Sequence, residues 1–392
     1  QRLRASLLGG ALFLSGALVS VPIFAQDPEA TEQTVTDEKS NKRFAEWDVL
    51  KPPFPLNTVN IKSNEITWAS LDVTPDGKHI VFDTLGDIFI SPMDGGDAQA
   101  LTQDFAWNIH PAVSPDGKQV AFISDRDGLS NVWVMNIDGT ELRQVTKEKN
   151  NIIHSPKWSP DGQYIVVTKG IMSSRSIPAG EIWMYHHTGG TGLAIKKRVN
   201  GLKDQKNIAD PAFSPDGQYI YYTQDVTGGF RFSYNRDPLT SVFAITRFDR
   251  ATGEEERFIS GTGGAVVPTP SPNGKHIAFI RRIQEKTALF IKDLATGTET
   301  AVFKDLERDM QEGFGSEGYF SYFDWTPDSE ALVFWTAGKI HRLQVSDQSL
   351  TTLNIHLNSQ LQYADAVRFD VDVAPDSFNT KMLRWSQKSP DG

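Results

Sequence analysis

The chain has 392 residues, 39% of them hydrophobic and 10% aromatic, so it is long enough for one large domain with a sizeable core. Its formal net charge of -10 excludes a nucleic-acid backbone as a natural partner, because like charges repel. The absence of cysteine excludes disulfides, thiolate nucleophiles and cysteine-ligated zinc.

Residues 1–25 have the layout of a secretory signal peptide. Arg2 and Arg4 precede an apolar run that extends from Leu7 to Phe24, and Ala25 stands before a polar segment. We expect cleavage after Ala25, export to the bacterial periplasm or the medium, and no stable membrane span after cleavage. The alternative is an uncleaved membrane anchor, for which this apolar run is at the short end. The polar residues 26–55 are expected to form a flexible leader.

A short motif, Ser/Thr-Pro-Asp-Gly, then repeats along the chain. Its copies begin at Thr74, Ser114, Ser159, Ser214, Ser271, Thr326 and Ser389, with Asn273 in place of the aspartate in the fifth copy and Ser329 in place of the glycine in the sixth. Proline fixes φ at the first corner of a turn, aspartate accepts backbone hydrogen bonds, and glycine adopts positive φ. Each copy therefore predicts a tight turn between two strands. A period of about 40 residues or more is typical of β-propeller blades.

The segments around each turn follow one order. A short apolar stretch precedes the turn, as at Ala112–Val113, Lys157–Trp158 and Asp324–Trp325. A strand such as Val120–Phe122 follows, then a third strand, a turn that usually contains glycine, and a more polar fourth strand. This order predicts an all-β fold, a β-propeller of four-stranded antiparallel blades. The alternative is a β-sandwich, but a sandwich does not repeat the same four-strand order six times.

Six repeats are complete, and we assign residues 56–357 to a six-bladed propeller. Residues 358–392 are expected to hold a connector and the truncated start of a seventh repeat, which stops at Gly392. A ring of seven or eight blades that is cut short is the alternative. Either interpretation predicts that the chain is a fragment of a longer protein.

The sequence contains no catalytic constellation, so no catalytic, cofactor-binding or metal-ligating residue is predicted. The eight histidines form neither a His-X-His nor a His-Glu-X-X-His arrangement. A Gly-X-Ser-X-Gly nucleophile elbow and a P-loop are also absent. His110 and His154 lie near matching positions of two repeats, which indicates shared packing rather than a shared site.

Insertions in the longer repeats are the better candidates for function, because loops on a rigid scaffold often carry binding residues. The extra length lies at residues 170–180, 196–210, 225–240 and 308–322. Arg175, Arg231, Tyr234 and Arg236 are our candidate ligand-facing residues, since they are suited to a carboxylate or a peptide backbone. The alternative is that these loops cover a neighbouring domain or simply solvate the face.

The Ser-Pro-Asp-Gly-Lys-X-Ile-X-Phe pattern resembles the PD40, TolB-like class of WD40-like propellers. Further stretches are most similar to the N-terminal propeller of exported bacterial amidohydrolase family proteins, and they lie at residues 68–88, 173–176, 263–272, 308–312, 333–342 and 373–376. This resemblance extends from about Trp47 to the end of the chain. It implies a parent hydrolase that acts on C–N bonds, with a metal-dependent catalytic barrel beyond this chain.

The resemblance implies that this chain is a non-catalytic propeller that gates or positions a substrate or partner. It implies no cofactor in this chain and a divalent metal in the absent catalytic domain. The expected partners are the C-terminal domain of the same protein, and a peptide or an envelope protein. Two alternatives stay open: a TolB-like periplasmic protein-binding module, and the propeller of a prolyl-oligopeptidase or tricorn-type peptidase.

Overall fold

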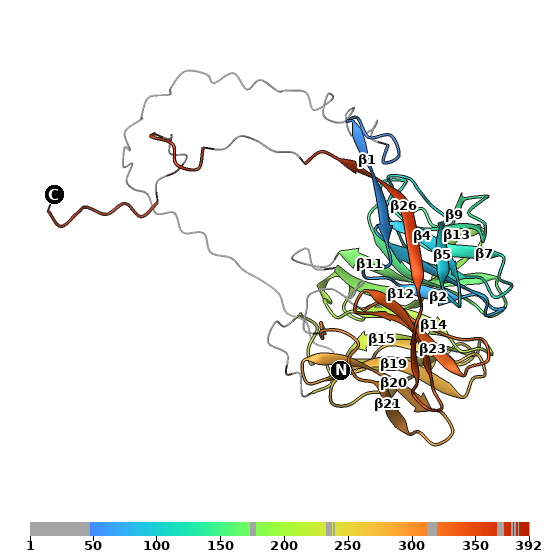
Figure 1. The fold of residues 1–392 in the computed structure, drawn as a ribbon. Helices are drawn as coiled ribbons and strands as arrows, with labels where there is room; N and C mark the ends of the chain where they lie inside the picture. The colour runs from blue at the N-terminus through green and yellow to red at the C-terminus, as the bar shows by residue number, and fades with distance from the viewer. Residues whose placement is uncertain are drawn as a thin grey trace, which may run out of the picture. The chain divides into compact units, whose positions relative to one another are not determined.

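The computed structural model describes residues 48–172, 178–232, 237, 240–311, 320–366, 372–377, 379, 382 and 384–391. Within these ranges, six sheets stand in a ring, each built on a four-stranded antiparallel blade, and the helical content is one short 3-10 turn, η2 (Gly201–Lys203) (Figure 1). The predicted all-β propeller of four-stranded blades is confirmed.

Each blade uses four strands that are consecutive in the sequence. Blade one contains β2 (Leu71–Val73), β3 (His79–Thr84), β4 (Asp87–Pro92) and β5 (Gly96–Ala100). Blade two contains β6 (Asn108–Val113), β7 (Gln119–Ser124), β8 (Asn131–Asn136) and β9 (Arg143–Gln144). Blade three contains β10 (Ile152–Trp158), β11 (Tyr164–Met172), β12 (Pro178–His186) and β13 (Gly189–Lys196).

The second half of the ring follows the same plan. Blade four contains β14 (Ile208–Phe213), β15 (Tyr219–Asp225), β16 (Phe243–Asp249) and β17 (Glu255–Ile259). Blade five contains β18 (Val266–Pro270), β19 (His276–Ile283), β20 (Lys286–Asp293) and β21 (Glu299–Phe303). Blade six contains β22 (Asp324–Trp325), β23 (Ala331–Thr336), β24 (Lys339–Gln344) and β25 (Leu350–Thr352).

The repeated motif forms the turn between the first and second strands of every blade. In blade two, the Ser114 hydroxyl donates to Asp116 Oδ1 at 2.7 Å, and the Lys118 amide donates to the same oxygen at 3.1 Å. The Gln119 amide donates back to Ser114 Oγ at 2.9 Å, while Gly117 adopts φ +71°. The other five blades repeat these three hydrogen bonds. One short motif thus specifies six identical turns.

The core of the molecule is divided among the interfaces between blades. Val81 of blade one packs in one apolar cluster with Phe122 of blade two, and similar clusters fill the next interfaces around the ring. Phe82 of blade one lies in a cluster with Val333 and Ile340 of blade six. Because this last cluster joins the sixth blade to the first, the ring closes with six blades.

A strand that follows blade six crosses back to blade one. β26 (Ile355–Ala364) pairs in parallel with β5, with Ile355 opposite Gly96, and β1 (Leu56–Ser63) pairs with β26 on its outer side. Figure 1 shows β26, in red, beside β1, and the sheet order is β1-β26-β5-β4-β3-β2. We call β1 and β26 the closing strands. They connect the two ends of the propeller to the same sheet.

Strands extend into two of the segments that were expected to be a connector or a loop. Residue 357, where the propeller was expected to end, lies inside β26, which continues to Ala364. Among the described residues beyond β26 there is no further strand, although the Ser389 hydroxyl contacts Asp391 Oδ1 as in the other copies of the motif. The insertion expected at residues 170–180 is also only partly a loop, because β11 and β12 remain paired out to Met172 and Pro178.

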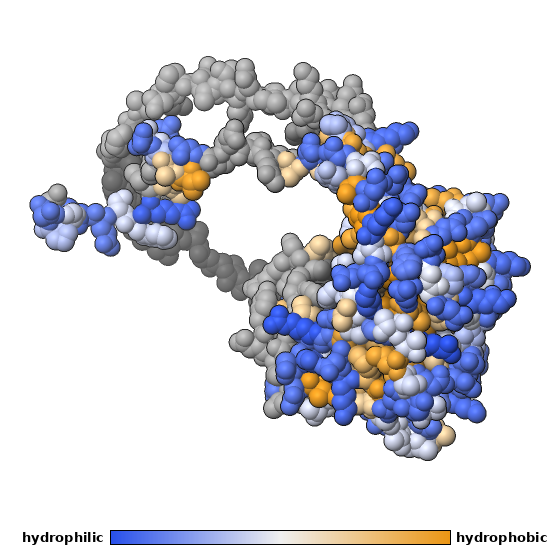
Figure 2. All heavy atoms as spheres, in the orientation of Figure 1, coloured by the Kyte–Doolittle hydropathy of each residue, from blue (hydrophilic) through white to orange (hydrophobic). Residues whose placement is uncertain are grey.

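Successive strands of a blade run in opposite directions, so successive turns lie on opposite faces of the ring. The motif turns all lie on one face, which we call the turn face. The four insertions connect the opposite ends of the strands, so they lie on the other face, which we call the insertion face. Figure 2 shows that hydrophilic residues cover most of the propeller surface in view and that apolar residues appear there in separate patches.

Candidate functional site

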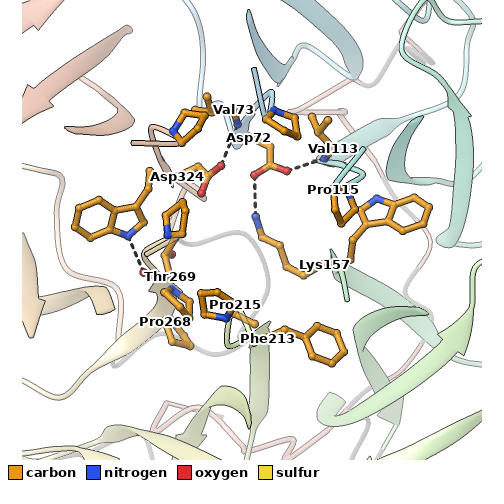
Figure 3. Close-up of a pocket in the computed structure, with 17 residues that line it drawn as sticks. Asp72, Val73, Val113, Pro115, Lys157, Phe213, Pro215, Pro268, Thr269 and Asp324 are labelled. Atoms are coloured by element: carbon orange, nitrogen blue, oxygen red, sulfur yellow. Dashed lines mark hydrogen bonds and ion pairs between the residues drawn. The ribbon is translucent and has the colours of Figure 1, made fainter. Parts of the chain in front are cut away.

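A cavity of about 440 Å³ opens at the centre of the turn face, and we call it the axial cavity. Its rim consists of motif prolines from five blades, Pro75, Pro115, Pro215, Pro272 and Pro327. Its walls come from the innermost strands β2, β6, β10, β14, β18 and β22, so every blade contributes to it (Figure 3). The repeated motif therefore builds both the blades and the mouth of the cavity.

The wall chemistry is set by one position in each repeat, two residues before the Ser/Thr of the motif. Around the ring these positions are occupied by Asp72, Ala112, Lys157, Ala212, Thr269 and Asp324. The two alanines leave space, while the two carboxylates and the ammonium supply charge. Figure 3 shows the Asp72, Lys157 and Asp324 side chains converging in the cavity.

Backbone amides of neighbouring blades hold the two carboxylates in place. Asp72 accepts a hydrogen bond from the Val113 amide at 2.6 Å and from Lys157 Nζ at 3.3 Å. Asp324 accepts one from the Val73 amide at 3.1 Å. These bonds cross from blade one to blades two, three and six, so the charged groups also connect the ring.

The three charges influence one another. Burial raises the pKa of Asp324 well above its ordinary value, the Asp72 carboxylate raises it further, and Lys157 acts in the opposite direction. Burial opposes the charge on Lys157, but Asp72 and Asp324 outweigh it and raise the pKa of this lysine. Lys157 therefore keeps its charge, and Asp324 its proton, to a higher pH than the same groups do in water.

Tyr322 forms the floor beneath these groups. Its hydroxyl donates to Asp210 Oδ1 at 2.8 Å and contacts the Ser155 hydroxyl, which brings together blades six, four and three. Its amide donates to Ser70 Oγ of blade one at 3.2 Å, and its ring lies edge-to-face against His110 of blade two at 4.9 Å. This one residue of blade six thus contacts four other blades near the axis, so the axial cavity has a closed floor.

A buried carboxylate supports this floor from blade one. Asp83 accepts hydrogen bonds from the Ser70 amide at 2.8 Å and from the His110 amide at 2.6 Å. Burial raises the pKa of Asp83 to about 7, and these two bonds only partly counteract it.

Of the candidate residues from the insertions, the structure describes Arg231, which is not part of the lining of the axial cavity. Arg231 lies on the insertion face, is exposed, and places its guanidinium 5.6 Å from the centroid of the Phe230 ring. Arg175, Tyr234 and Arg236 lie outside the described residues. A second hollow of about 300 Å³ lies on the insertion face between half-exposed Trp68 and Trp107.

Sequence reasoning missed the charged residues of the cavity. It took Lys157–Trp158 and Asp324–Trp325 as apolar stretches before the turn; in fact only the tryptophans are core residues. Trp325 Nε1 donates to the Thr269 carbonyl of the preceding blade at 2.9 Å, whereas Asp324 faces the cavity. The signal was present, because aligning the repeats puts two aspartates and a lysine at a position where two other copies have alanine.

Two kinds of feature are absent from the described part of the chain. Among these residues, no group of three or more His, Asp or Glu side chains is placed to hold a metal ion. Over the same ranges, the structure contains no helix with the length and hydrophobicity that a membrane crossing requires.

Comparisons with known proteins find similar sequences and a similar solved structure. Residues 72–177 match the family described as the tricorn protease N-terminal beta propeller domain. The chain is 37% identical over 264 residues to the protein TolB homolog of Chlorobium chlorochromatii, which covers 60% of this chain and 53% of that protein. It is 27% identical over 359 residues to dipeptidyl-peptidase 5 of Porphyromonas gingivalis, which covers 78% of this chain and 50% of that protein.

A solved structure, TolB from Acinetobacter baumannii, aligns with a TM-score of 0.53 at 17% identity, over 75% of this chain and 65% of that chain. Together these similarities support a propeller module of the PD40, TolB-like type. The chain spans between 9% and 50% of the length of four curated relatives that it matches. None of the proteins named here is an amidohydrolase, so the amidohydrolase parent stays a prediction.

Proposed function

We propose that this chain is a non-catalytic propeller module that binds an extended peptide segment end-on in the axial cavity. The observation that carries the proposal is the cavity itself, which combines an apolar proline rim with charged groups at its base. Its volume of about 440 Å³ suits a short segment rather than a folded partner.

The closed floor determines the direction of binding. Because Tyr322 spans the axis beneath the cavity, a segment enters from the turn face and stops there. The proline rim offers flat apolar surfaces to the flanking residues of the segment, and a rigid rim lowers the entropic cost of binding. Binding or positioning, rather than passage through the ring, is the function that this geometry supports.

Filling the cavity tests the proposal. Ala212 lines the cavity, so Ala212→Phe should occupy the space without changing any charge. Fluorescence polarisation with labelled random octapeptide pools should detect binding to the wild-type protein and its loss in Ala212→Phe. Ala251→Phe, on the exposed turn between β16 and β17, is the matched control and should bind as the wild type does. Equal binding by all three proteins, or none by any, would overturn the proposal.

The named relatives favour two wider roles over the amidohydrolase prediction. We propose that the module serves either a TolB-like protein-binding system or a tricorn-like or dipeptidyl-peptidase-like peptidase, since proteins with those names share its sequence or fold. In both cases peptide is the expected ligand. Export remains part of this proposal, and cell fractionation should find the protein in the periplasm with residues 1–25 removed.

A further inference from the structure

The axial cavity contains more acidic than basic groups. Its titratable lining groups are Asp72 on β2, Lys157 on β10 and Asp324 on β22, and the floor below adds Asp210 and Tyr322. Lys157 Nζ lies 3.3 Å from Asp72. Within the described residues, no lysine or arginine forms an ion pair with Asp324. The cavity lining therefore has one carboxyl group more than it has ammonium groups.

The position of this acid is well defined. Asp324 is held by the Val73 amide at 3.1 Å, and its neighbour Asp72 by the Val113 amide at 2.6 Å. Ala212, on blade four, lines the other side of the cavity with a small side chain and leaves room there. Figure 3 shows Asp324 and Asp72 side by side with Lys157 approaching from across the cavity. Two fixed acceptors beside open space form a ready site for a hydrogen-bond donor with positive charge.

We propose that the axial cavity recognises a primary ammonium group of its ligand, which binds at Asp324 and Asp72 while the adjoining peptide lies against the proline rim. This inference rests on the proposed function and names the chemistry that selects the peptide. An ammonium on a peptide comes from its N-terminus or from a lysine side chain. Both fit a cavity with a closed floor, because either can be the leading end of the segment.

A metal ion suits the cavity less well than an ammonium. Among the described residues, two carboxylates line the space, those of Asp72 and Asp324. An ammonium donates directed hydrogen bonds and carries one charge, which balances the single excess carboxylate. A divalent ion would need further oxygen ligands.

Ligand binding should be linked to release of a proton. In the free protein Asp324 readily holds a proton, because it is buried beside Asp72. A ligand ammonium favours the ionised carboxylate, so the proton leaves Asp324 for the solvent while the ammonium keeps its own protons. The affinity for ammonium-bearing peptides should therefore rise with pH until Asp324 is ionised in the free protein.

Three peptides separate the two sources of the ammonium. They are Ala-Pro-Ala-Pro amide with a free N-terminus, its N-acetylated form, and N-acetyl-Lys-Pro-Ala-Pro amide. Isothermal titration calorimetry should show that at least one of the two ammonium-bearing peptides binds wild-type protein about 10-fold or more tightly than the capped peptide. The free N-terminus and the lysine peptide report the two sources separately.

Charge variants locate the effect at Asp324. In Asp324→Asn the advantage of the ammonium-bearing peptide should disappear, as should the proton release measured in two buffers of different ionisation enthalpy. Asp97→Asn removes a carboxylate whose side chain is 94% exposed on β5, and it should change neither quantity. Lys157→Met removes the competing ammonium and should tighten binding of the same peptide. This opposite effect keeps the proposal testable if Asp324→Asn folds poorly.

Two results would overturn different conclusions. If the capped peptide binds the cavity as tightly as the ammonium-bearing peptides, ammonium recognition is wrong and the proposed peptide binding stands. If no peptide binds, or if Ala212→Phe leaves binding unchanged, the proposed function itself is wrong.

Discussion

Tyr322 contacts residues of several blades near the propeller axis. It extends from blade six to Asp210 and Ser155, and its backbone contacts Ser70. A buried hydroxyl with two partners is costly to remove, since the partners remain buried without it. Tyr322 therefore stabilises the centre of the ring and also sets the depth of the axial cavity.

Removing this hydroxyl should destabilise the protein. We expect Tyr322→Phe to lower the free energy of unfolding by about 1–3 kcal/mol, because Ser155 and Asp210 lose a buried hydrogen-bond partner. Urea denaturation followed by circular dichroism measures the change. Tyr363→Phe, at a half-exposed tyrosine of β26, is the control and should change stability by less than about 0.5 kcal/mol. Equal effects of the two substitutions would contradict a central role for Tyr322.

Among the structural elements, the closing strands differ most from the repeat. Blades two to six each consist of four consecutive strands, but blade one gains β26 and β1. Gly95 permits this docking, because a Cβ at this position would lie 2.8 Å from the Asn354 carbonyl oxygen. Ile355 and Leu357 then join the apolar cluster between blades six and one. β26 thus covers the interface at which the ring closes.

Shortening one apolar side chain of β26 tests this role. Leu357 is 4% exposed, so Leu357→Ala should lower the free energy of unfolding by about 2–5 kcal/mol through lost burial and the cavity left behind. Gln360→Ala, at an exposed position of the same strand, should change it by less than about 0.5 kcal/mol. Chemical denaturation of both variants provides the comparison. A Leu357→Ala protein as stable as the wild type would show that β26 does not secure the ring.

At the scale of the whole molecule, two groups of carboxylates respond to pH in opposite ways. Hydrogen bonds from the motif hydroxyls lower the pKa of the turn aspartates, which are Asp76, Asp116, Asp161, Asp216 and Asp328. Their stabilisation is present above the unfolded value of 3.8 and is lost as the pH falls through their folded values. Burial raises the pKa of both Asp83 and Asp87 to about 7. Stabilisation from these two is fully present below 3.8 and is lost as the pH rises through about 7.

The contribution of Asp83 can be isolated by substitution. Between pH 4 and 7 the wild-type protein should lose up to about 1.4 kcal/mol of stability per pH unit from this group, and Asp83→Asn should not. The readout is the difference in urea midpoint between the two proteins at pH 5, 6, 7 and 8. The comparison with Asp83→Asn is needed because other groups also change the stability with pH. Burial lowers the pKa of His341, so this histidine makes the protein more stable as the pH rises towards the ordinary histidine pKa of 6.5. A difference that stays constant with pH would contradict a neutral Asp83.

The sequence by itself determined the architecture of this protein. A turn of Ser/Thr, Pro, Asp and Gly is a local structure, since its hydrogen bonds join residues no more than five positions apart. Six regular copies were therefore enough to predict six blades of four strands.

Only the tertiary structure decided how the ring closes and where its site lies. β26 pairs with β5, which is more than 250 residues away in the sequence. Neither strand contains a sequence pattern that predicts this pairing. The cavity combines Asp72, Lys157 and Asp324, which are distant along the chain but occupy the same position of different repeats. In the sequence, each of the three is one charged residue next to an apolar one. The three side chains come close to one another only when the ring closes. The proposed binding surface therefore lies on the turn face that the repeat builds. The described residues of the insertions lie on the opposite face, and a binding role for the candidate residues there stays a prediction.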